Sequence, residues 1–256
     1  MRQFLSRFLA RSAPSAPVEE LPPVLPDQPF VAIGDVHGRA DLLHALDPLI
    51  EAQGNGLPVV FLGDYVDRGE HSREVVKMLM SATAHDPLRI TCLMGNHERM
   101  MLDVLDEPET HTARWLRNGG LQTLASFGVP SPQGRLNDID AVFDMRAALI
   151  EAMGPAMIDW LRARPLTWQS GNVWAVHAGA DPAEPMAAQA EDVLLWGHPG
   201  FRKQPRTDGQ WVIHGHTIVD APQVTSGRIA IDTGAYATAR LTAAIVREGN
   251  VTFLQT

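Results

Sequence analysis

Residues 58–69 read PVVFLGDYVDRG. An apolar run of strand-forming residues leads directly into Gly63 and Asp64, a pattern that predicts a buried strand ending in a polar turn. Two more stretches repeat this design, FVAIGDVHG at 30–38 and RITCLMGNHE at 89–98. The residues between them have helical periodicity, and each repeat has the length of one crossover unit, about 30 residues. The sequence therefore predicts parallel strands that alternate with helices.

Metal-ligand side chains follow each of these predicted strands. Two later stretches add histidines in the same setting, His177-Ala178-Gly179 and His214-Gly215-His216-Thr217. Because the carboxyl ends of strands in an α/β sheet face one crevice, we expect these side chains to converge there. Carboxylate, amide and imidazole donors without a thiolate suit Mn, Fe or Zn. A single His at a strand end is more often packed than metal-bound, but five such motifs in one chain predict a metal site.

The rest of the chain divides into a helical and a strand-rich part. Residues from about 99 to 170 are rich in Leu, Ala, Met and charged residues, and we expect a mostly helical insertion after the third strand. Five short apolar runs follow, and the last two resemble a hairpin. These runs cover residues 172–176, 210–213, 228–231, 242–246 and 251–254.

The composition excludes several classes of protein. The chain has 256 residues, of which 45% are hydrophobic, so it can bury a core and is not wholly disordered. Its formal net charge of −9 argues against nucleic-acid binding, which needs a basic surface. The only cysteine, Cys92, cannot form an internal disulfide, and no apolar run has the length of a membrane span. We therefore expect a cytoplasmic protein without a transmembrane segment; its oligomeric state stays open.

Residues 1–29 differ from the remainder. Residues 1–11 read MRQFLSRFLAR, an amphipathic and basic pattern, and six prolines follow. Arg7 interrupts the apolar run, which argues against a secretory signal. A short helix in weak contact with a membrane surface and a frayed tail are the two alternatives. We expect a flexible tail over 1–29 and a single domain over 30–256.

The ordered motifs Gly-Asp-x-His-Gly, Gly-Asp-x-Val-Asp-Arg-Gly, Gly-Asn-His-Glu, His-Ala-Gly and Gly-His-Thr are similar to those of a known family. They resemble the phosphoprotein phosphatase branch of the calcineurin-like metallophosphoesterases, in particular its bacterial members of the bacteriophage lambda phosphatase type. The resemblance covers residues 30 to about 256. It implies an α/β fold, a β-sandwich flanked by helices, with two metal ions at its edge. It also implies hydrolysis of phosphate monoesters by a metal-bridging hydroxide.

The resemblance assigns roles residue by residue. It implies that Asp64 bridges the two metal ions and that His97 is the general acid. Asp67 would orient the His97 imidazole, and Arg68 would bind the phosphate. His216 matches the ligand of its motif better than His214. The implied metal ligands are Asp35, His37, Asp64, Asn96, His177 and His216. The favoured ion is Mn²⁺, with Fe and Zn as alternatives.

The substrate contacts are less clearly marked. Met94 stands where many relatives have a basic residue, and His198 stands where another charge is usual. Arg202, four residues after His198, is a possible substitute. Asn118 and Tyr236 are further candidates for the pocket wall. A solvated loop for His198 and a glycine-capped helix end at Asn118 are the alternatives.

Three functions fit the motifs. The first is a serine/threonine or dual-specificity protein phosphatase that acts on phosphorylated proteins. The second keeps the chemistry but acts on small phosphoesters, as symmetrical diadenosine tetraphosphate hydrolases do. The third is a metal-binding interaction module without turnover. The presence of His97, Asp67 and Arg68 argues against the third function.

Overall fold

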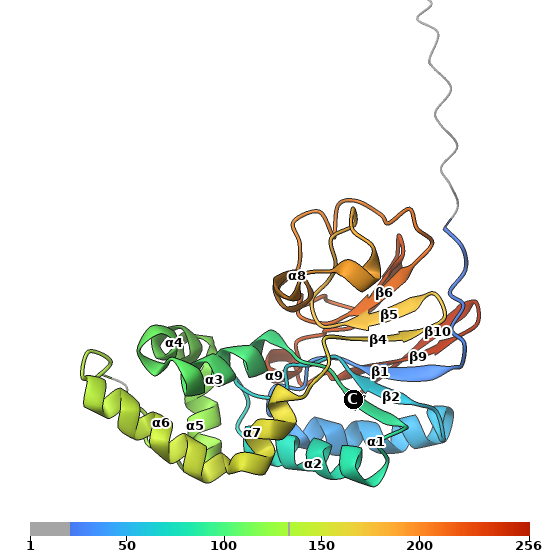
Figure 1. Ribbon diagram of the computed structural model, residues 1–256. Coiled ribbons are helices and arrows are strands. Elements are labelled where there is room, and N and C mark those ends of the chain that lie inside the picture. The colour runs from blue at the N-terminus through green and yellow to red at the C-terminus, as the bar shows by residue number, and fades with distance from the viewer. Residues whose placement is uncertain (1–20, 133) are drawn as a thin grey trace, which may run out of the picture.

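The computed structural model describes residues 21–132 and 134–256. Two five-stranded β-sheets are stacked on each other, and helices flank them (Figure 1). The first sheet has the strand order β10-β9-β1-β2-β3, and the second has the order β4-β5-β6-β8-β7. The strands are β1 (Phe30–Ile33), β2 (Val59–Phe61), β3 (Ile90–Cys92), β4 (Thr167–Ser170), β5 (Val173–Val176), β6 (Trp211–His214), β7 (Gln223–Thr225), β8 (Arg228–Ala230), β9 (Thr242–Arg247) and β10 (Asn250–Gln255).

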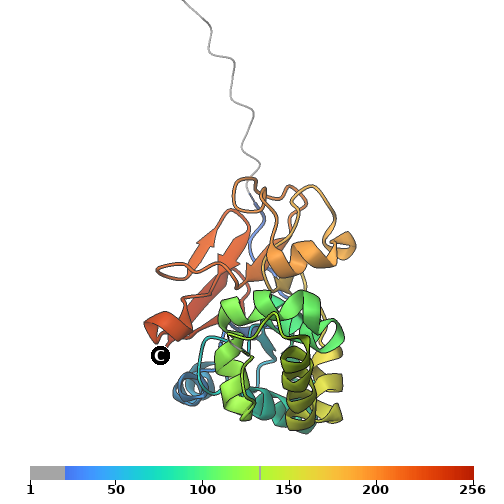
Figure 2. The ribbon, with the colours of Figure 1, turned by 90° about the vertical axis from the view of Figure 1, so that its left-hand side faces the viewer.

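The helices form two groups. α1 and α2 cover the outer face of the first sheet, and α3 to α7 gather beside the sandwich (Figures 1 and 2). The helices are α1 (Ala40–Gly54), α2 (Ser72–His85), α3 (Asn96–Asp106), α4 (Pro108–Trp115), the π-helical turn η1 (Leu116–Gly120), α5 (Leu121–Phe127), α6 (Ile139–Met153), α7 (Pro155–Arg162), the 3-10 turn η2 (Met186–Ala188), α8 (Glu191–Trp196) and α9 (Ala235–Thr238).

The alternation of side chains in β1 explains the layers. Phe30 and Ala32 point into the core between the sheets, whereas Val31 and Ile33 join the core under the helices. All four are buried, because a strand between a second sheet and a helical layer has two apolar faces. Burial of these side chains thus stabilises the packing of β1 against the second sheet on one face and against the helices on the other.

The predicted parallel strands are confirmed. β2 pairs in parallel with β1 on one side and with β3 on the other. The carboxyl ends of all three strands therefore lie at the same edge of the sheet. The expected hairpin of β9 and β10 is also present, with antiparallel pairing.

The helical insertion is shorter than the sequence predicts. Helices occupy residues from Asn96 to Arg162, but residues 167–170 form β4, which pairs antiparallel with β5. This edge strand is short, and its pairing with a distant segment overrides the weak local pattern. Gly119 interrupts the helices with a φ of 106°, a backbone conformation that favours glycine.

The folded part of the chain begins before Phe30. Val24 is buried in the core between the sheets, and its carbonyl accepts a hydrogen bond from the Gly249 N–H. The Leu25 N–H donates to Asn172 Oδ1 over 2.7 Å. The segment 21–29, which we expected in the flexible tail, is thus packed along the sandwich, because even a proline-rich segment can use its carbonyls as acceptors. The amphipathic stretch 1–11 lies outside the described residues.

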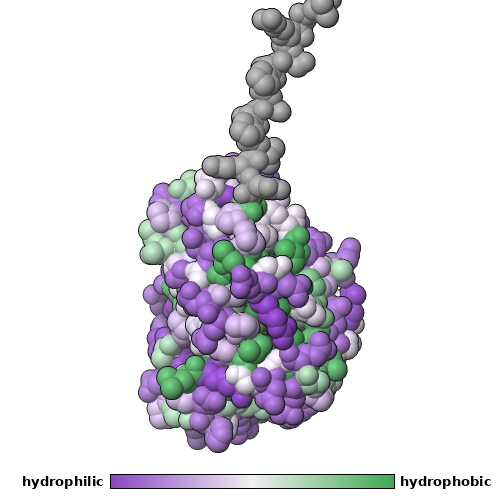
Figure 3. Space-filling view, turned by 90° about the vertical axis from the view of Figure 1, so that its right-hand side faces the viewer, coloured by the Kyte–Doolittle hydropathy of each residue, from purple (hydrophilic) through white to green (hydrophobic). Residues whose placement is uncertain are grey.

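On the face shown in Figure 3, hydrophobic and hydrophilic residues are interspersed. Over residues 21–132 and 134–256, no helix has both the length and the apolar character needed to cross a bilayer.

Candidate functional site

The site lies where the loops after the strands meet, and its backbone is strained. Seven non-glycine residues in the described part of the chain have positive φ. Five of them are predicted site residues: His37, Asp64, Asp67, Arg68 and His216. Each such conformation costs of order 1–3 kcal/mol and persists only where the surrounding structure holds it. The strain is therefore concentrated on the residues that the motifs single out.

Asp64 lies at the centre of the predicted metal ligands. These residues are called the cluster below: Asp35, His37, Asp64, Asn96, His177 and His216. Its Oδ2 is 3.4 Å from His37 Nε2, and its Oδ1 is 3.4 Å from His177 Nε2. The two carboxylate oxygens thus face two different imidazoles. Two groups of metal-ligand atoms share Asp64, one with His37 and His97 and the other with His177 and His216.

A second set of donors converges on Asn96, the first residue of α3. Asn96 Oδ1 lies 2.8 Å from His177 Nε2 and 2.9 Å from His216 Nδ1. His177 comes from the end of β5, and His216 comes from the loop after β6. Residues from both sheets therefore meet at one point. His214 is directed elsewhere, since its ring packs 5.0 Å from the ring of Phe201.

Backbone carbonyls orient two of the imidazoles. His37 Nδ1 is 2.8 Å from the carbonyl oxygen of Val66, and His177 Nδ1 is 2.9 Å from that of Leu62. When Nδ1 donates its hydrogen to a carbonyl, the lone pair is left on Nε2. Both Nε2 atoms face Asp64, as metal-binding nitrogens would.

The electrostatics of the cluster suit cations. Burial, followed by the charges of Asp232 and Asp64, raises the pKa of Asp35 well above its usual value. Burial lowers the pKa of His37 to about 3 and that of His216 to about 4, so both rings are neutral at pH 7. Neutral imidazoles and ionised carboxylates are the forms that bind metal, and bound cations would favour the ionised form of Asp35. The donor set therefore fits two divalent cations, which would offset the repulsion between the carboxylates.

His97 and Asp67 form a buried pair beside this cluster. His97 Nδ1 is 2.7 Å from Asp67 Oδ2, and both side chains are almost inaccessible to solvent. Burial alone would lower the pKa of His97, but Asp64 and Asp67 raise it above its ordinary value. Arg68 Nη2 lies 3.1 Å from His97 Nε2, so Arg68 and His97 present neighbouring nitrogens. The arrangement places a guanidinium that can bind an anion beside an imidazole whose pKa is raised.

The four predicted substrate contacts lie in different places. The Tyr236 ring is 5.4 Å from the His37 ring, and the Arg68 guanidinium lies over it at 4.7 Å. The Asn118 amide donates to the carbonyl of Arg114. His198, in the loop after α8, has its Nε2 3.7 Å from Oδ2 of Asp181 in the loop after β5, and Arg202 is exposed in the turn after Phe201. These contacts thus bring Tyr236 to the cluster, and they join neither His198 nor Arg202 to it.

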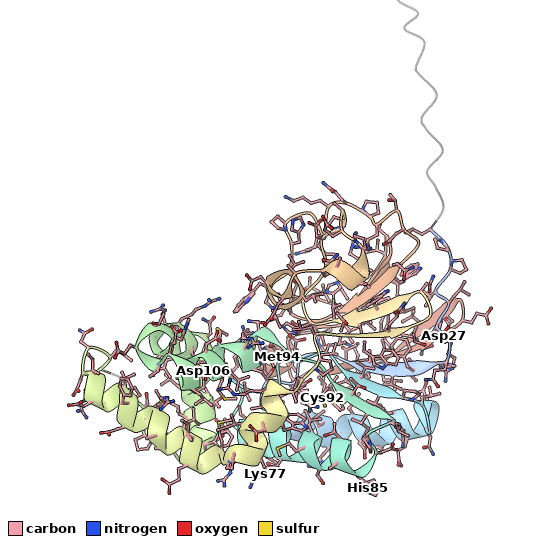
Figure 4. The ribbon with its side chains drawn as sticks, in the orientation of Figure 1. Asp27, Lys77, His85, Cys92, Met94 and Asp106 are labelled. Carbon is pink, nitrogen blue, oxygen red and sulfur yellow. The ribbon has the colours of Figure 1, made fainter. Side chains whose placement is uncertain are left out.

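The residue before the third motif cannot contact a substrate. Met94 is 1% exposed, and Figure 4 shows it where the chain leaves β3 toward the helices. The position that we expected to lack an anion contact is therefore part of the core.

Sequence reasoning missed two groups of residues near the site. Arg114 stacks on the Trp196 ring at 4.3 Å, and that ring is 6.4 Å from the ring of His216. Trp115 and Thr123 hydrogen-bond the carboxylate of Asp67. In the sequence, the pair Gly119-Gly120 was the one local feature of residues 115–120 that pointed to these contacts.

A family model for the calcineurin-like phosphoesterases matches residues 28–220. The chain belongs to this family. Membership confirms the superfamily that the ordered motifs predicted, although it does not separate the bacterial branch from the others. The family uses divalent metals, in agreement with the donor groups around Asp64.

The chain is similar to several known proteins. It is 45% identical over 71 residues to a catalytic subunit of protein phosphatase 2A from Dictyostelium discoideum, a match that covers 27% of this chain and 22% of that one. The chain spans between 22% and 36% of the length of the curated relatives it matches.

Two solved structures show the same fold. A proposed diadenosine tetraphosphatase superposes with a TM-score of 0.61 at 19% identity, covering 90% of this chain and 94% of that one. A serine/threonine phosphatase from Saccharomyces cerevisiae superposes with a TM-score of 0.56 at 16% identity, covering 91% and 83%. These superpositions confirm the predicted α/β sandwich flanked by helices.

Proposed function

We propose that the chain is a metal-dependent phosphomonoesterase that acts on phosphorylated serine and threonine side chains of proteins. One observation carries the proposal: Asp64 presents its two oxygens to two groups of ligand atoms, next to the His97–Asp67 pair and Arg68. When bound, two divalent cations would polarise the phosphoryl oxygens and supply the nucleophilic hydroxide. Asp35, His37 and Asp64 would hold one ion, and Asp64, Asn96, His177 and His216 would hold the other.

The chain's own groups supply the remaining chemistry. A phosphate beside Arg68 would accept hydrogen bonds from its planar guanidinium, which matches phosphate geometry. In the structure the guanidinium can only donate, so His97 Nε2 accepts from Arg68 over 3.1 Å. Once a phosphate takes the Arg68 hydrogen bonds, a protonated Nε2 would be placed to donate its proton to the departing alkoxide. Asp67, on the other ring nitrogen, holds the tautomer and stabilises the protonated ring.

The substrate class rests on two kinds of support. The motifs resemble those of phosphoprotein phosphatases, and the Dictyostelium relative carries the name of a protein phosphatase. The alternative, a small phosphoester such as a dinucleoside polyphosphate, uses the same chemistry. A competition panel with Mn²⁺ supplied would separate the two: the proposal expects phosphopeptides to compete better than nucleotides and dinucleoside polyphosphates, and the reverse order would overturn it.

The role of His97 is tested by changing the leaving group. A serine alkoxide needs a proton far more than a nitrophenolate does, so His97→Ala should lower phosphoserine hydrolysis by roughly 10²–10⁴-fold. Hydrolysis of nitrophenyl phosphate should fall distinctly less, and the metal content should stay unchanged. Both substrates are assayed on the same preparations, with metal content measured by mass spectrometry. Equal losses on the two substrates, or loss of a metal ion, would contradict the assignment.

A further inference from the structure

Asp67 and Arg68 follow each other in the left-handed backbone region, with φ of 72° and 67°. Two consecutive non-glycine residues in this region are costly, so other groups must hold them. The Asp67 N–H donates to Thr123 Oγ1 over 2.8 Å, and the Arg68 N–H donates to the Gly119 carbonyl over 3.2 Å. Both acceptors belong to residues 108–127, which form α4, η1 and α5 and are called the helical segment below.

Gly119 is required for this contact. A Cβ at Gly119 would lie 2.6 Å from the backbone nitrogen of Arg68, closer than real side chains approach. With φ of 106°, Gly119 also has a conformation that other residues avoid. Because Gly119 has no side chain, the turn η1 can pack directly against the backbone of Asp67 and Arg68.

The same segment also supplies two donors to the Asp67 carboxylate. Trp115 Nε1 donates to Oδ1 and Oδ2 over 3.0 and 3.1 Å. The Thr123 hydroxyl donates to Oδ1 over 2.7 Å, while His97 Nδ1 contacts Oδ2. All four side chains are buried. A buried carboxylate with three donors is held in one orientation, and its hydrogen bond with His97 fixes the orientation of the imidazole in turn.

We propose that Trp115 and Thr123 are positioning residues, which aim the Asp67–His97 pair at the leaving group of the substrate. This inference rests on the proposed function, in which His97 is the proton donor. The helical segment then has a role in the reaction itself, besides packing. The exposed Arg114, next to Trp115, stacks on the Trp196 ring, which is 6.4 Å from the ring of His216, so helix α4 contacts the surroundings of both Asp67 and His216.

The test compares two substituents at one buried position. Thr123→Val keeps the shape but loses the hydroxyl, and we expect kcat/KM for a phosphoserine peptide to fall about 10–100-fold, as for other groups that orient a catalytic side chain. Nitrophenyl phosphate, which needs less protonation, should lose less than about threefold. Thr123→Ser restores the hydroxyl and should restore the peptide activity. All assays use the full chain loaded with Mn²⁺.

Thr112 offers a matched control. It is a buried threonine in α4 whose hydroxyl donates to the Pro108 carbonyl over 2.6 Å, without touching Asp67. Thr112→Val removes a comparable hydrogen bond, so it should leave the ratio of the two activities unchanged. An equal loss on both substrates in Thr123→Val, or no loss, would overturn the inference.

His97→Ala separates this inference from the proposed function. If His97→Ala lowers both activities equally, the proton-donor role itself fails. If His97→Ala is selective for the peptide but Thr123→Val is not, only the positioning role fails. In the double variant His97→Ala/Thr123→Val, the second change should have no further effect, because it acts through a residue that is gone.

A measurement without substrate gives an independent answer. In protein labelled with ¹⁵N-tryptophan, the Trp115 indole N–H should be protected from solvent exchange, and Asp67→Asn should shift its resonance. A fast-exchanging or unshifted indole would contradict the hydrogen bond on which the inference depends. If Thr123→Val does not fold, Trp115→Phe takes its place under the same substrate criterion.

Discussion

Asp64 shows how one side chain can organise a site at the scale of the residue. Its oxygens lie 3.4 Å from His37 Nε2 and from His177 Nε2, and His97 Nε2 is 3.9 Å from Oδ2. Burial would raise the pKa of Asp64, but the three histidines lower it below its usual value. Asp64 is therefore an ionised carboxylate with imidazole nitrogens facing both of its oxygens, as a bridging ligand requires.

We predict that Asp64→Asn lowers the metal content and nearly abolishes turnover. An amide cannot offset the charge of two cations, and it presents only one acceptor oxygen. Metal content is measured by mass spectrometry beside the activity on nitrophenyl phosphate. Asp41→Asn, at an exposed carboxylate that pairs with Arg39, is the control and should change neither. Full activity with two metal ions in Asp64→Asn would disprove the bridging role.

Cys92 lies outside the candidate site, and we predict that it makes the stability depend on pH. It is buried at the end of β3, and burial raises the pKa of its thiol to about 12 (Figure 4). An unfolded cysteine has a pKa of about 8.5. Above that pH the unfolded chain loses the proton while the folded chain keeps it, so the free energy of unfolding falls as the pH rises.

The expected slope can be measured against a variant without the thiol. Between pH 8 and pH 10 the wild type should lose about 2 kcal/mol more stability than Cys92→Ala. Urea unfolding of both proteins at several pH values, with Mn²⁺ present throughout, gives the two curves. Parallel curves would show that the folded thiol ionises as readily as the unfolded one.

At the scale of the element, the first three residues of helix α3 make three different sets of contacts. Successive residues of a helix point about 100° apart. Asn96 faces the histidines, His97 faces Asp67, and Glu98 turns back to the backbone. Glu98 accepts the N–H groups of Gly95, Asp64, Tyr65 and Val66. The helix start is therefore tied to the loop that carries Asp64.

We predict that Glu98→Gln destabilises the protein by roughly 3 kcal/mol, because an NH₂ group would face buried N–H donors. Burial, followed by the charge of Asp64, raises the pKa of Glu98, and the N–H groups of Val66 and Tyr65 oppose that rise because they stabilise the ionised carboxylate. The measurement is the midpoint of urea unfolding. Glu51→Gln, at an exposed position of α1, should leave the midpoint unchanged. A loss below about 0.5 kcal/mol would mean that the loop does not depend on this carboxylate.

At the scale of the whole molecule, the first described residues contact both sheets, since the Val24 carbonyl accepts the Gly249 N–H of the turn between β9 and β10 and the second sheet supplies further partners. Trp211 Nε1 in β6 donates to the Pro22 carbonyl over 2.9 Å, and the Gly171 N–H donates to Asp27 Oδ2 over 2.9 Å. Figure 4 shows Asp27 at the side of the sandwich away from the helical segment. Residues 21–29 thus lie along the edge of the sandwich opposite the site.

We predict that a chain beginning at residue 30 is less stable than one beginning at residue 21 by roughly 3–5 kcal/mol. The shorter chain loses the buried Val24 side chain and several backbone hydrogen bonds. The two truncated chains are compared by urea unfolding and by nitrophenyl phosphate hydrolysis. Because the site lies at the other edge, we expect the activity per folded molecule to be the same. Equal unfolding midpoints would contradict this prediction and would support a domain that begins at Phe30.

Local patterns in the sequence determined the parallel strands and the family. Apolar runs that end in Gly-Asp or Gly-Asn mark β1, β2 and β3, since strand and turn preferences act over a few neighbouring residues. Tertiary structure alone decided which side chains support the site. Trp115 and Thr123 reach Asp67 across 48 and 56 residues, and Leu25 reaches Asn172 across 147. Such contacts leave no periodic signal, because they depend on how the helical segment and the chain start fold back onto the sheets.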